Sequence, residues 1–354
     1  MKEFWSSRIR DMVPYTPGEQ PKDRKFIKLN TNENPYPPSP GALAAIRELA
    51  GESLRLYPDP EAGKLRGALA RFHGVGEDQV FVGNGSDEVL GFCFQAFFGP
   101  ERAICFPDIS YSFYPVYAGL FGVPYEEVPL NGDFSVPVEE FIGNNGGVIL
   151  PNPNAPTGIA LPLSDIERLA AGNPDAAVII DEAYVDFGTD SALALLDRYP
   201  NLLVVRTMSK SRSLAGMRVG YAIGSANLIA ALNCVKNSFN SYTLDRVALA
   251  AAEGSVADND YFEETRSRIM ATRERTAEQL TAMGFQVCPS RANFLFVSYP
   301  GVSGKELLDG LREKGILVRW WGKPRISDHL RITIGTDGEM DALIAALAQL
   351  TGQT

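Results

Sequence analysis

Short apolar runs alternate with longer amphipathic stretches from about residue 79 onward. Each apolar run has the length of a buried strand, and together the runs cover residues 79–82, 102–105, 147–150, 176–180, 202–205 and 219–223. The stretches between them repeat their apolar residues with a helical period, as at residues 86–98, 164–171 and 226–235. Strands that alternate with helices predict an α/β fold in which a mostly parallel sheet carries helices on both faces, giving three layers.

The two ends of the chain depart from this alternation. Residues 1–40 contain seven prolines, which prevent long regular structure, so we expect an N-terminal arm there. Residues 261–283 form a long charged stretch with a helical period, and the order strand, helix, strand, strand, helix follows it. That order predicts a smaller α+β domain. We therefore expect an arm at 1–40, a large domain at 41–255 and a small domain at 256–354.

Composition excludes several classes of function. The chain has 354 residues, of which 45% are hydrophobic and 21% charged, as in ordinary soluble globular proteins. Its 43 acidic residues outnumber 33 basic ones and no basic block occurs, so we expect no nucleic-acid partner. No apolar run approaches the roughly 18 residues of a transmembrane helix, and the first residues carry no apolar signal region. We therefore expect no membrane association and a cytoplasmic location. The only histidines are His73 and His329, and no two cysteines form a C-x-x-C pair, so we expect no metal site.

A lysine-containing segment directly follows one of the apolar runs. Lys210 comes shortly after the strand predicted at 202–205, and Thr207, Ser209 and Arg218 lie close to it in sequence. Ligands of open α/β sheets bind at the carboxyl ends of the strands, and a guanidinium group can fork onto phosphate oxygens. The segment therefore indicates a reactive lysine beside a phosphate pocket. The alternative is a solvated loop lysine with serine neighbours, because a motif this short also occurs by chance.

Three other polar segments follow predicted strands. Asp181 ends the fourth apolar run, where a buried carboxylate needs a partner or a cation, and a pyridinium N–H would suit it. Gly85, Ser86 and Asp87 open the helix after the first run, where free N–H groups attract an anion. Asn154 follows the third run, and its carboxamide would donate to a phenolate-like oxygen. The ordinary alternatives are helix N-caps and, for Asn154, a proline turn.

Together these groups match the requirements of pyridoxal 5′-phosphate. Lysine can supply a free amine to this cofactor where burial and nearby positive charge lower its pKa. Through these segments the chain resembles the fold type I aminotransferases, which depend on pyridoxal phosphate, and more closely it is similar to histidinol-phosphate aminotransferases. The resemblance extends over nearly the whole length and is carried by residues 14–15, 29–35, 55–58, 85–88, 111–114, 154–158, 181–184, 209–218 and 330–335.

The resemblance implies a role for each residue around the cofactor. Lys210 would hold the cofactor and move the proton at the substrate Cα, while Asp181 would pair with the ring nitrogen. Tyr184 would bond the phenolic oxygen, and Tyr111 would stack on the ring. The residues that would surround the cofactor phosphate are Gly85, Ser86, Asp87, Thr207, Ser209 and Arg218.

Further roles implied by the resemblance concern the substrate and a second subunit. Arg319 and Arg331 would bind the anionic ends of the substrates. Tyr15 of the arm would assist them, and Asn32 would lie near the substrate. Tyr57 would reach the cofactor phosphate of the other subunit, which implies a homodimer.

The chain departs from the family pattern at one position. Many members have an asparagine directly before the Pro-Thr-Gly motif, where it contacts the phenolic oxygen of the cofactor, but this chain has Ala155 there. Asn154 lies one residue earlier, so its side chain need not point the same way. The contact therefore passes to Asn154 or Asn152, or it is lost.

The reaction implied by the resemblance belongs to histidine biosynthesis. It exchanges an amino group between histidinol phosphate and 2-oxoglutarate, giving imidazole-acetol phosphate and glutamate, and the partners would be small-molecule substrates. Two alternatives keep the cofactor but change the chemistry: an aromatic amino-acid aminotransferase and a decarboxylase of threonine phosphate. A third alternative is a regulator that binds ligand without turnover, although no DNA-binding module is visible in the sequence.

Overall fold

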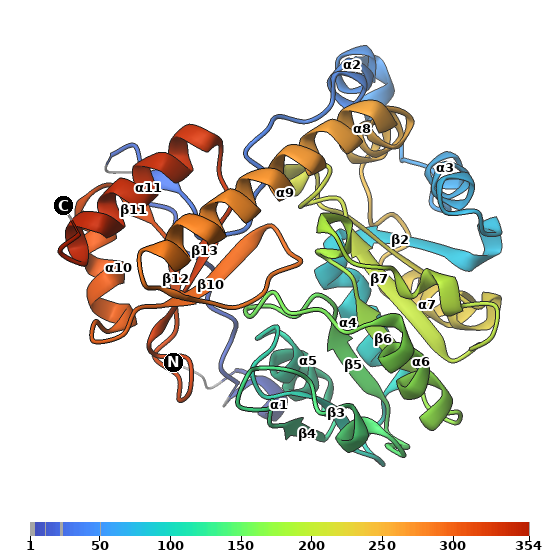
Figure 1. Ribbon diagram of the computed structural model, residues 1–354. Coiled ribbons are helices and arrows are strands. Elements are labelled where there is room, and N and C mark those ends of the chain that lie inside the picture. Colours follow the sequence, from blue (N-terminus) through green and yellow to red (C-terminus); the bar gives the residue numbers. More distant parts are fainter. Residues whose placement is uncertain (1–3, 11, 22–23, 50, 354) are drawn as a thin grey trace.

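A seven-stranded sheet forms the centre of the fold in a computed structural model that describes residues 4–10, 12–21, 24–49 and 51–353 (Figure 1). The strands, in spatial order, are β2 (Val80–Asn84), β8 (Val219–Gly224), β7 (Leu202–Thr207), β6 (Val178–Asp181), β5 (Val148–Pro151), β3 (Ile104–Pro107) and β4 (Tyr125–Val128). Strand β8 is antiparallel to both of its neighbours, and the other four neighbouring pairs are parallel. The predicted α/β fold with a mostly parallel sheet is therefore confirmed.

The apolar runs locate most of this sheet. Each of the six predicted runs is a strand whose first residue differs by at most two positions from the prediction. The strand that was not predicted, β4, lies at the edge of the sheet, and its residues Tyr125, Glu126 and Glu127 are exposed. An edge strand with one side in water needs no apolar run, and charged residues there also prevent pairing with other chains.

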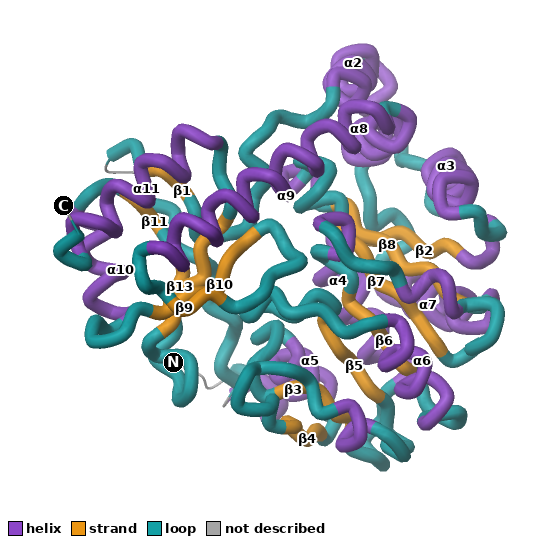
Figure 2. The backbone as a smooth tube through the Cα atoms, in the orientation of Figure 1, coloured by secondary structure: helices purple, strands orange, loops and turns teal. Residues whose placement is uncertain are grey.

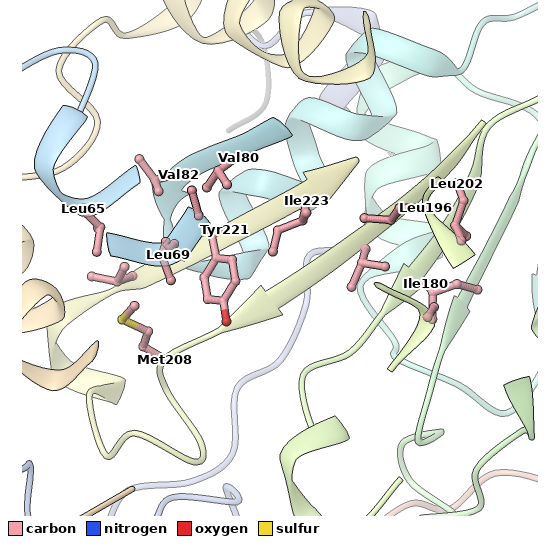
Figure 3. Close-up of a cluster of buried hydrophobic side chains, with 14 of the residues drawn as sticks. Leu65, Leu69, Val80, Val82, Ile180, Leu196, Leu202, Met208, Tyr221 and Ile223 are labelled. Atoms are coloured by element: carbon pink, nitrogen blue, oxygen red, sulfur yellow. The ribbon is translucent and has the colours of Figure 1, made fainter. Parts of the chain in front are cut away.

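Two apolar cores lie on opposite faces of the sheet because successive strand residues point in opposite directions. In β6, Val178 and Ile180 belong to one core and Ile179 to the other. Figure 3 shows the first core around Ile180 and Tyr221. The helices of the first core are α2 (Pro40–Leu49), α3 (Gly63–His73), α6 (Leu163–Gly172) and α8 (Arg246–Ala257). The helices of the second core are α4 (Gly85–Phe97), α5 (Tyr114–Phe121) and α7 (Ala226–Phe239).

A second sheet lies beside the first and is antiparallel throughout (Figure 2). Its strands, in spatial order, are β12 (Arg319–Trp320), β13 (His329–Thr333), β10 (Phe294–Ser298) and β9 (Gln286–Val287). The long helix α9 (Asn259–Ala282) runs from α8 to this sheet, and α10 (Gly304–Glu313) and α11 (Asp337–Leu350) pack against its apolar side chains. Strand β1 (Ile27–Lys28) pairs in parallel with β11 (Ile316–Leu317), which ties the N-terminal segment to this part of the molecule.

Short helices complete the chain. They are α1 (Ser7–Arg10) and the 3-10 helices η1 (Glu52–Arg55), η2 (Glu77–Gln79), η3 (Val138–Phe141), η4 (Val185–Phe187), η5 (Ala192–Leu195) and η6 (Ala215–Met217). Among the described helices, none is both long and apolar enough to cross a membrane. The described residues also contain no group of three or more His, Cys, Asp or Glu side chains placed to hold a metal ion.

Candidate active site

A cavity of about 480 Å³ opens at the carboxyl ends of the central parallel strands. This is the edge at which open α/β sheets bind ligands. Residues from the N-terminal segment and from the second sheet form the other wall of the cavity. The predicted site residues that line it are Tyr15, Asn32, Ser86, Asp87, Tyr111, Asp181, Tyr184, Thr207, Ser209, Lys210, Arg218, Arg319 and Arg331.

Lys210 lies in the loop after β7, with its amine in the cavity. The Nζ atom donates a hydrogen bond to the carbonyl oxygen of Thr31 at 3.1 Å. The Nδ2 atom of Asn34 donates to the Lys210 carbonyl oxygen at 3.0 Å, which holds the loop in place. Burial lowers the pKa of Lys210 to about 8, and the positive charge of Arg331 is the second cause. An amine with this pKa is partly uncharged near neutral pH, so it can act as a nucleophile or as a base.

Asp181 is a buried carboxylate at the end of β6, on the face covered by α4 and α5. Its oxygens accept hydrogen bonds from the Tyr114 hydroxyl at 3.1 Å and from the Ala183 N–H at 3.2 Å. Burial raises the pKa of Asp181 to about 7, although these two donors oppose the rise. Within the described part of the chain, neither lysine nor arginine donates to this carboxylate. The site is therefore suited to a cationic N–H from a ligand, which would restore the charged carboxylate.

A set of phosphate-binding groups lies where β7 and β8 meet the start of α4. The Arg218 guanidinium pairs with the Asp87 carboxylate at 3.1 Å and lies 3.5 Å from the Ser209 hydroxyl. The Thr207 hydroxyl donates to that same Ser209 hydroxyl at 3.0 Å. Gly85 has a φ of 79°, and a side chain built there would meet the Arg218 guanidinium. Because the first N–H groups of α4 have no partner within the helix, this corner can bind a phosphate.

Tyr184 is linked to the N-terminal segment through Asn32. The Asn32 Nδ2 atom donates to the Tyr184 hydroxyl oxygen at 2.9 Å. The Thr333 hydroxyl accepts from the Asn32 N–H at 3.0 Å and donates to the Asn32 carboxamide oxygen at 3.0 Å. Burial raises the pKa of Tyr184, so its hydroxyl stays protonated and can donate a hydrogen bond into the cavity.

Arg319 and Arg331 stand opposite each other on neighbouring strands, β12 and β13. Arg331 donates to the Asn30 carbonyl oxygen at 3.0 Å, and its Nε is buried with no hydrogen-bond partner. Arg319 donates to the carbonyl oxygen of Thr16 at 3.2 Å. Neither guanidinium forms an ion pair with a carboxylate of the described residues, although like charges in this arrangement repel each other. Two guanidinium groups without a carboxylate partner favour an anionic ligand in the cavity.

Aromatic side chains line the cavity between the phosphate-binding corner and the two arginines. The ring of Tyr15 stacks on Phe113 with a centroid distance of 4.4 Å, and it lies 6.5 Å from the ring of Tyr111. The Tyr111 hydroxyl donates to the Asp87 carboxylate at 2.7 Å, which fixes the orientation of its ring in the cavity. The N-terminal segment thus contacts the start of α5 through Tyr15 and the second sheet through the bond from Arg319 to Thr16.

Three predicted residues do not line the cavity. Gly85 lies behind Ser86 and contributes backbone only. The Asn154 carboxamide donates to the Ile109 carbonyl oxygen and to the Thr157 hydroxyl, both at 3.0 Å, while Ala155 lines the cavity. Tyr57 is 78% exposed on the outer surface and stacks on Tyr242 at a centroid distance of 4.7 Å.

Sequence reasoning missed several residues that shape the site, among them Tyr114 and Trp321. Tyr114 donates to Asp181, and its spacing of three from Tyr111 at a helix start is a signal for a shared face. Trp321 lines the cavity, and its ring centre lies 5.5 Å from the Arg319 guanidinium and 5.2 Å from that of Arg331. Its spacing of two from Arg319 in an extended segment could have indicated it.

The chain is similar to aminotransferases over almost its whole length. Residues 24–347 match a family described as aminotransferase class I and II. Histidinol-phosphate aminotransferase 1 of Methylococcus capsulatus is 56% identical over 350 residues, which are 99% of this chain and 98% of that protein. Histidinol-phosphate aminotransferase 2 of Dechloromonas aromatica is 56% identical over 356 residues, which are 99% of this chain and 100% of that protein.

Solved structures agree with this similarity. The crystal structure of histidinol-phosphate aminotransferase from Sinorhizobium meliloti in complex with pyridoxal-5′-phosphate has a TM-score of 0.85 and 28% identity. The match covers 93% of this chain and 92% of that one. L-threonine-O-3-phosphate decarboxylase from Porphyromonas gingivalis has a TM-score of 0.78 at 22% identity, covering 92% of this chain and 100% of that one, and it shows the fold alone.

Proposed function

Because the chain belongs to the class I and II aminotransferase family, we propose that it transfers an amino group from histidinol phosphate to 2-oxoglutarate, giving imidazole-acetol phosphate and glutamate, and that this step serves histidine biosynthesis. The observation that carries the choice of substrate is the pair Arg319 and Arg331, two guanidinium groups that face the cavity without carboxylate partners among the described residues. A phosphate monoester and a dicarboxylate both present forked anionic oxygens, so one pair of arginines can serve both substrates.

The cavity fits pyridoxal 5′-phosphate as the cofactor. The fit rests on Asp181, a buried carboxylate that lacks a cationic partner among the described residues, and on the phosphate-binding corner around Arg218. When bound, pyridoxal phosphate supplies an electron sink for negative charge that develops at the substrate Cα. Lys210 would attach it covalently, and Asp181 would keep its ring nitrogen protonated. Thr207, Ser209 and the first N–H groups of α4 would hold its phosphate.

The side chains of the site then divide the remaining work. The Lys210 amine, whose pKa is lowered to about 8, can take the proton from the substrate Cα and return it. The Tyr184 hydroxyl, oriented by Asn32, would donate to the phenolic oxygen of the cofactor. The Nδ2 atom of Asn154, its only donor, already bonds to Ile109 and Thr157, so we assign the phenolic oxygen to Tyr184 without a second contact from Asn154.

A homodimer fits the exposed apolar surface around Tyr57. Two nearby segments of the chain, which meet where Tyr57 stacks on Tyr242, carry large hydrophobic side chains in water. Exposed apolar groups that cluster in this way are typical of an interface between proteins. We place a second copy of the chain there, with Tyr57 directed to the partner's cofactor phosphate. The exposed side chains are Leu54, Leu56, Tyr57, Phe239 and Tyr242.

A reducing compartment such as the cytoplasm fits the state of the cysteines. All four cysteines are free thiols, and Cys93 and Cys105 are buried. Burial raises the pKa of each of these two thiols, so both stay protonated and unreactive. Free cysteines are typical of proteins that work where glutathione keeps thiols reduced.

A donor screen on the purified protein loaded with pyridoxal phosphate tests the substrate. Histidinol phosphate, histidinol, phenylalanine and threonine phosphate would each be offered with 2-oxoglutarate, and glutamate formation and carbon dioxide release would be measured. We expect histidinol phosphate to have the highest kcat/KM, by two or more orders of magnitude over histidinol. A preference for phenylalanine would contradict the substrate, and carbon dioxide release from threonine phosphate would contradict the reaction.

A further inference from the structure

A series of buried and half-buried hydrogen bonds, in which each acceptor is a carboxylate, joins the loop after β6 to the loop after β7. Glu182 directly follows Asp181, and its side chain is 0% exposed. One of its carboxylate oxygens accepts from Arg206 Nε at 3.0 Å and from Arg206 Nη2 at 2.9 Å. The same carboxylate accepts from the Ser191 hydroxyl at 2.7 Å and from the Ala192 N–H at 2.6 Å. Four hydrogen bonds therefore fix the position of the Glu182 carboxylate.

The series continues to the residue beside the reactive lysine. Arg206 Nη1 donates to the Asp186 Oδ1 atom at 3.3 Å, and the Ser211 hydroxyl donates to Asp186 Oδ2 at 2.5 Å. Ser211 directly follows Lys210 and is 3% exposed. Glu182, Arg206, Asp186 and Ser211 are not among the described residues that line the cavity. They reach the cavity through their charge and through chain neighbours that line it, among them Asp181 and Lys210.

Stability alone does not explain why this network is built from charged side chains. Replacing buried ion pairs by apolar side chains of similar volume is often neutral or stabilising. Charged hydrogen bonds, in contrast, fix distances and directions between the groups that they join. They also matter for charge, because Glu182 is one of the lesser causes that raise the pKa of Asp181 to about 7, and Arg206 offsets that charge at close range.

We propose that Glu182, Arg206, Asp186 and Ser211 form an ionic brace that positions the Lys210 amine relative to Asp181, which makes them positioning residues for the transfer reaction. The effect on catalysis rests on the proposed function, whereas the hydrogen bonds of the brace are present in the chain without cofactor or substrate. Asn34 holds the same loop from its other side, through the carbonyl oxygens of Lys210 and Ser211. Loss of the brace at the Ser211 end therefore frees one side of the loop and lets the amine move toward water.

The test compares two variants that each remove one hydroxyl donor to a buried carboxylate of the same network. Ser211→Ala removes the bond next to Lys210, whereas Ser191→Ala removes a bond to Glu182 at the far end, where three other hydrogen bonds remain. In the cofactor-free chain, competitive acetylation with acetic anhydride followed by mass spectrometry gives the pH midpoint of Lys210 labelling. Asp186→Asn is a second variant, which keeps the shape of the side chain and removes its charge.

In the parent chain we expect a labelling midpoint near the lowered pKa of Lys210, about 8. Ser211→Ala and Asp186→Asn should raise this midpoint by about half a pH unit or more, because a less buried amine regains its ordinary pKa. The same variants, loaded with pyridoxal phosphate, should lose roughly tenfold in kcat with a smaller change in KM. Ser191→Ala should leave the midpoint at the parent value.

Two outcomes would overturn the brace. One is a parent-like midpoint in both Ser211→Ala and Asp186→Asn, and the other is an equal shift in Ser191→Ala, which would show a general loosening of the core. The acetylation uses no substrate and no cofactor, so its result stands apart from the donor screen. A protein that fails to use histidinol phosphate could still show the brace, and the reverse also holds.

Discussion

Replacement of Arg331 by alanine should remove most of the selectivity for a phosphorylated amino donor. Arg331 Nη2 donates one hydrogen bond to the Asn30 carbonyl oxygen, and Nε is buried without a partner, so the guanidinium has further N–H groups that can fork onto an anion. Two hydrogen bonds between charged groups contribute about 1.5–3 kcal/mol each, or about 3–6 kcal/mol together. At about 1.4 kcal/mol per tenfold in rate, kcat/KM for histidinol phosphate should fall by roughly 10²–10⁴.

The same replacement should cost the cofactor-free chain little stability. Arg331 faces Arg319 across the two strands and has no carboxylate partner among the described residues, so its removal breaks no ion pair. The repulsion that it relieves offsets part of the lost bond to Asn30 and of the lost contact with the Trp321 ring. If Arg331 instead served a buried salt bridge, its loss would cost about 3–5 kcal/mol. The two readings therefore predict different melting temperatures as well as different kinetics.

The assay is a comparison of kcat/KM for histidinol phosphate and histidinol in the parent and in three variants, with the melting temperature of each cofactor-free chain. Arg331→Lys keeps the charge but loses the fork, so its selectivity should be intermediate. Arg275→Ala is the control, because Arg275 pairs with Asp337 and Asp341 on the surface. An unchanged ratio of the two donors in Arg331→Ala, or a large loss of stability, would refute the assignment of Arg331 to the substrate phosphate.

Four further changes test other parts of the site. Lys210→Ala should abolish the covalent fixation of pyridoxal phosphate by borohydride, and fixation on another lysine would contradict its role. Asp181→Asn should lower kcat by several orders of magnitude with the cofactor still bound, whereas near-normal turnover would reduce Asp181 to a structural group. A mixture of inactive Lys210→Ala and Tyr57→Ala chains should regain activity through one intact site per heterodimer, and no regain in a proven dimer argues against a shared site. Burial is the main cause that lowers the pKa of His73 from 6.5 to about 3. Between about pH 3 and pH 6.5 the unfolded chain therefore binds a proton at His73 that the folded chain does not bind. For this reason the unfolding free energy should fall as the pH drops below about 6.5. Urea unfolding at pH 7 and at pH 5 gives the loss in unfolding free energy for the parent and for His73→Gln. The loss should be smaller in His73→Gln, by at most about 2 kcal/mol, and equal losses in the two proteins would count against a buried neutral His73.

Local pattern was enough to predict the layers of the fold and the strand ends that carry the site. The runs that became β5, β6 and β7 are apolar because both faces of these strands are covered, so each could be recognised without knowing its neighbours. Lys210 and Asp181 were found for the same reason, since polar residues directly after such runs must lie at the edge where ligands bind. The edge strand β4 was missed because its side chains face water, so they need not be apolar and leave no apolar run in the sequence.

Tertiary structure decided whatever depends on two distant segments. The opposition of Arg319 and Arg331 comes from the register of β12 on β13, and the pairing of β1 with β11 joins segments almost 300 residues apart. No local period encodes a register or a partner, because both are chosen by the packing of the whole core. The direction of Asn154, turned from the cavity by its bonds to Ile109 and Thr157, was open for the same reason. The sequence by itself therefore determined which chemical groups stand at the strand ends, and the packing of the two sheets determined which of them meet.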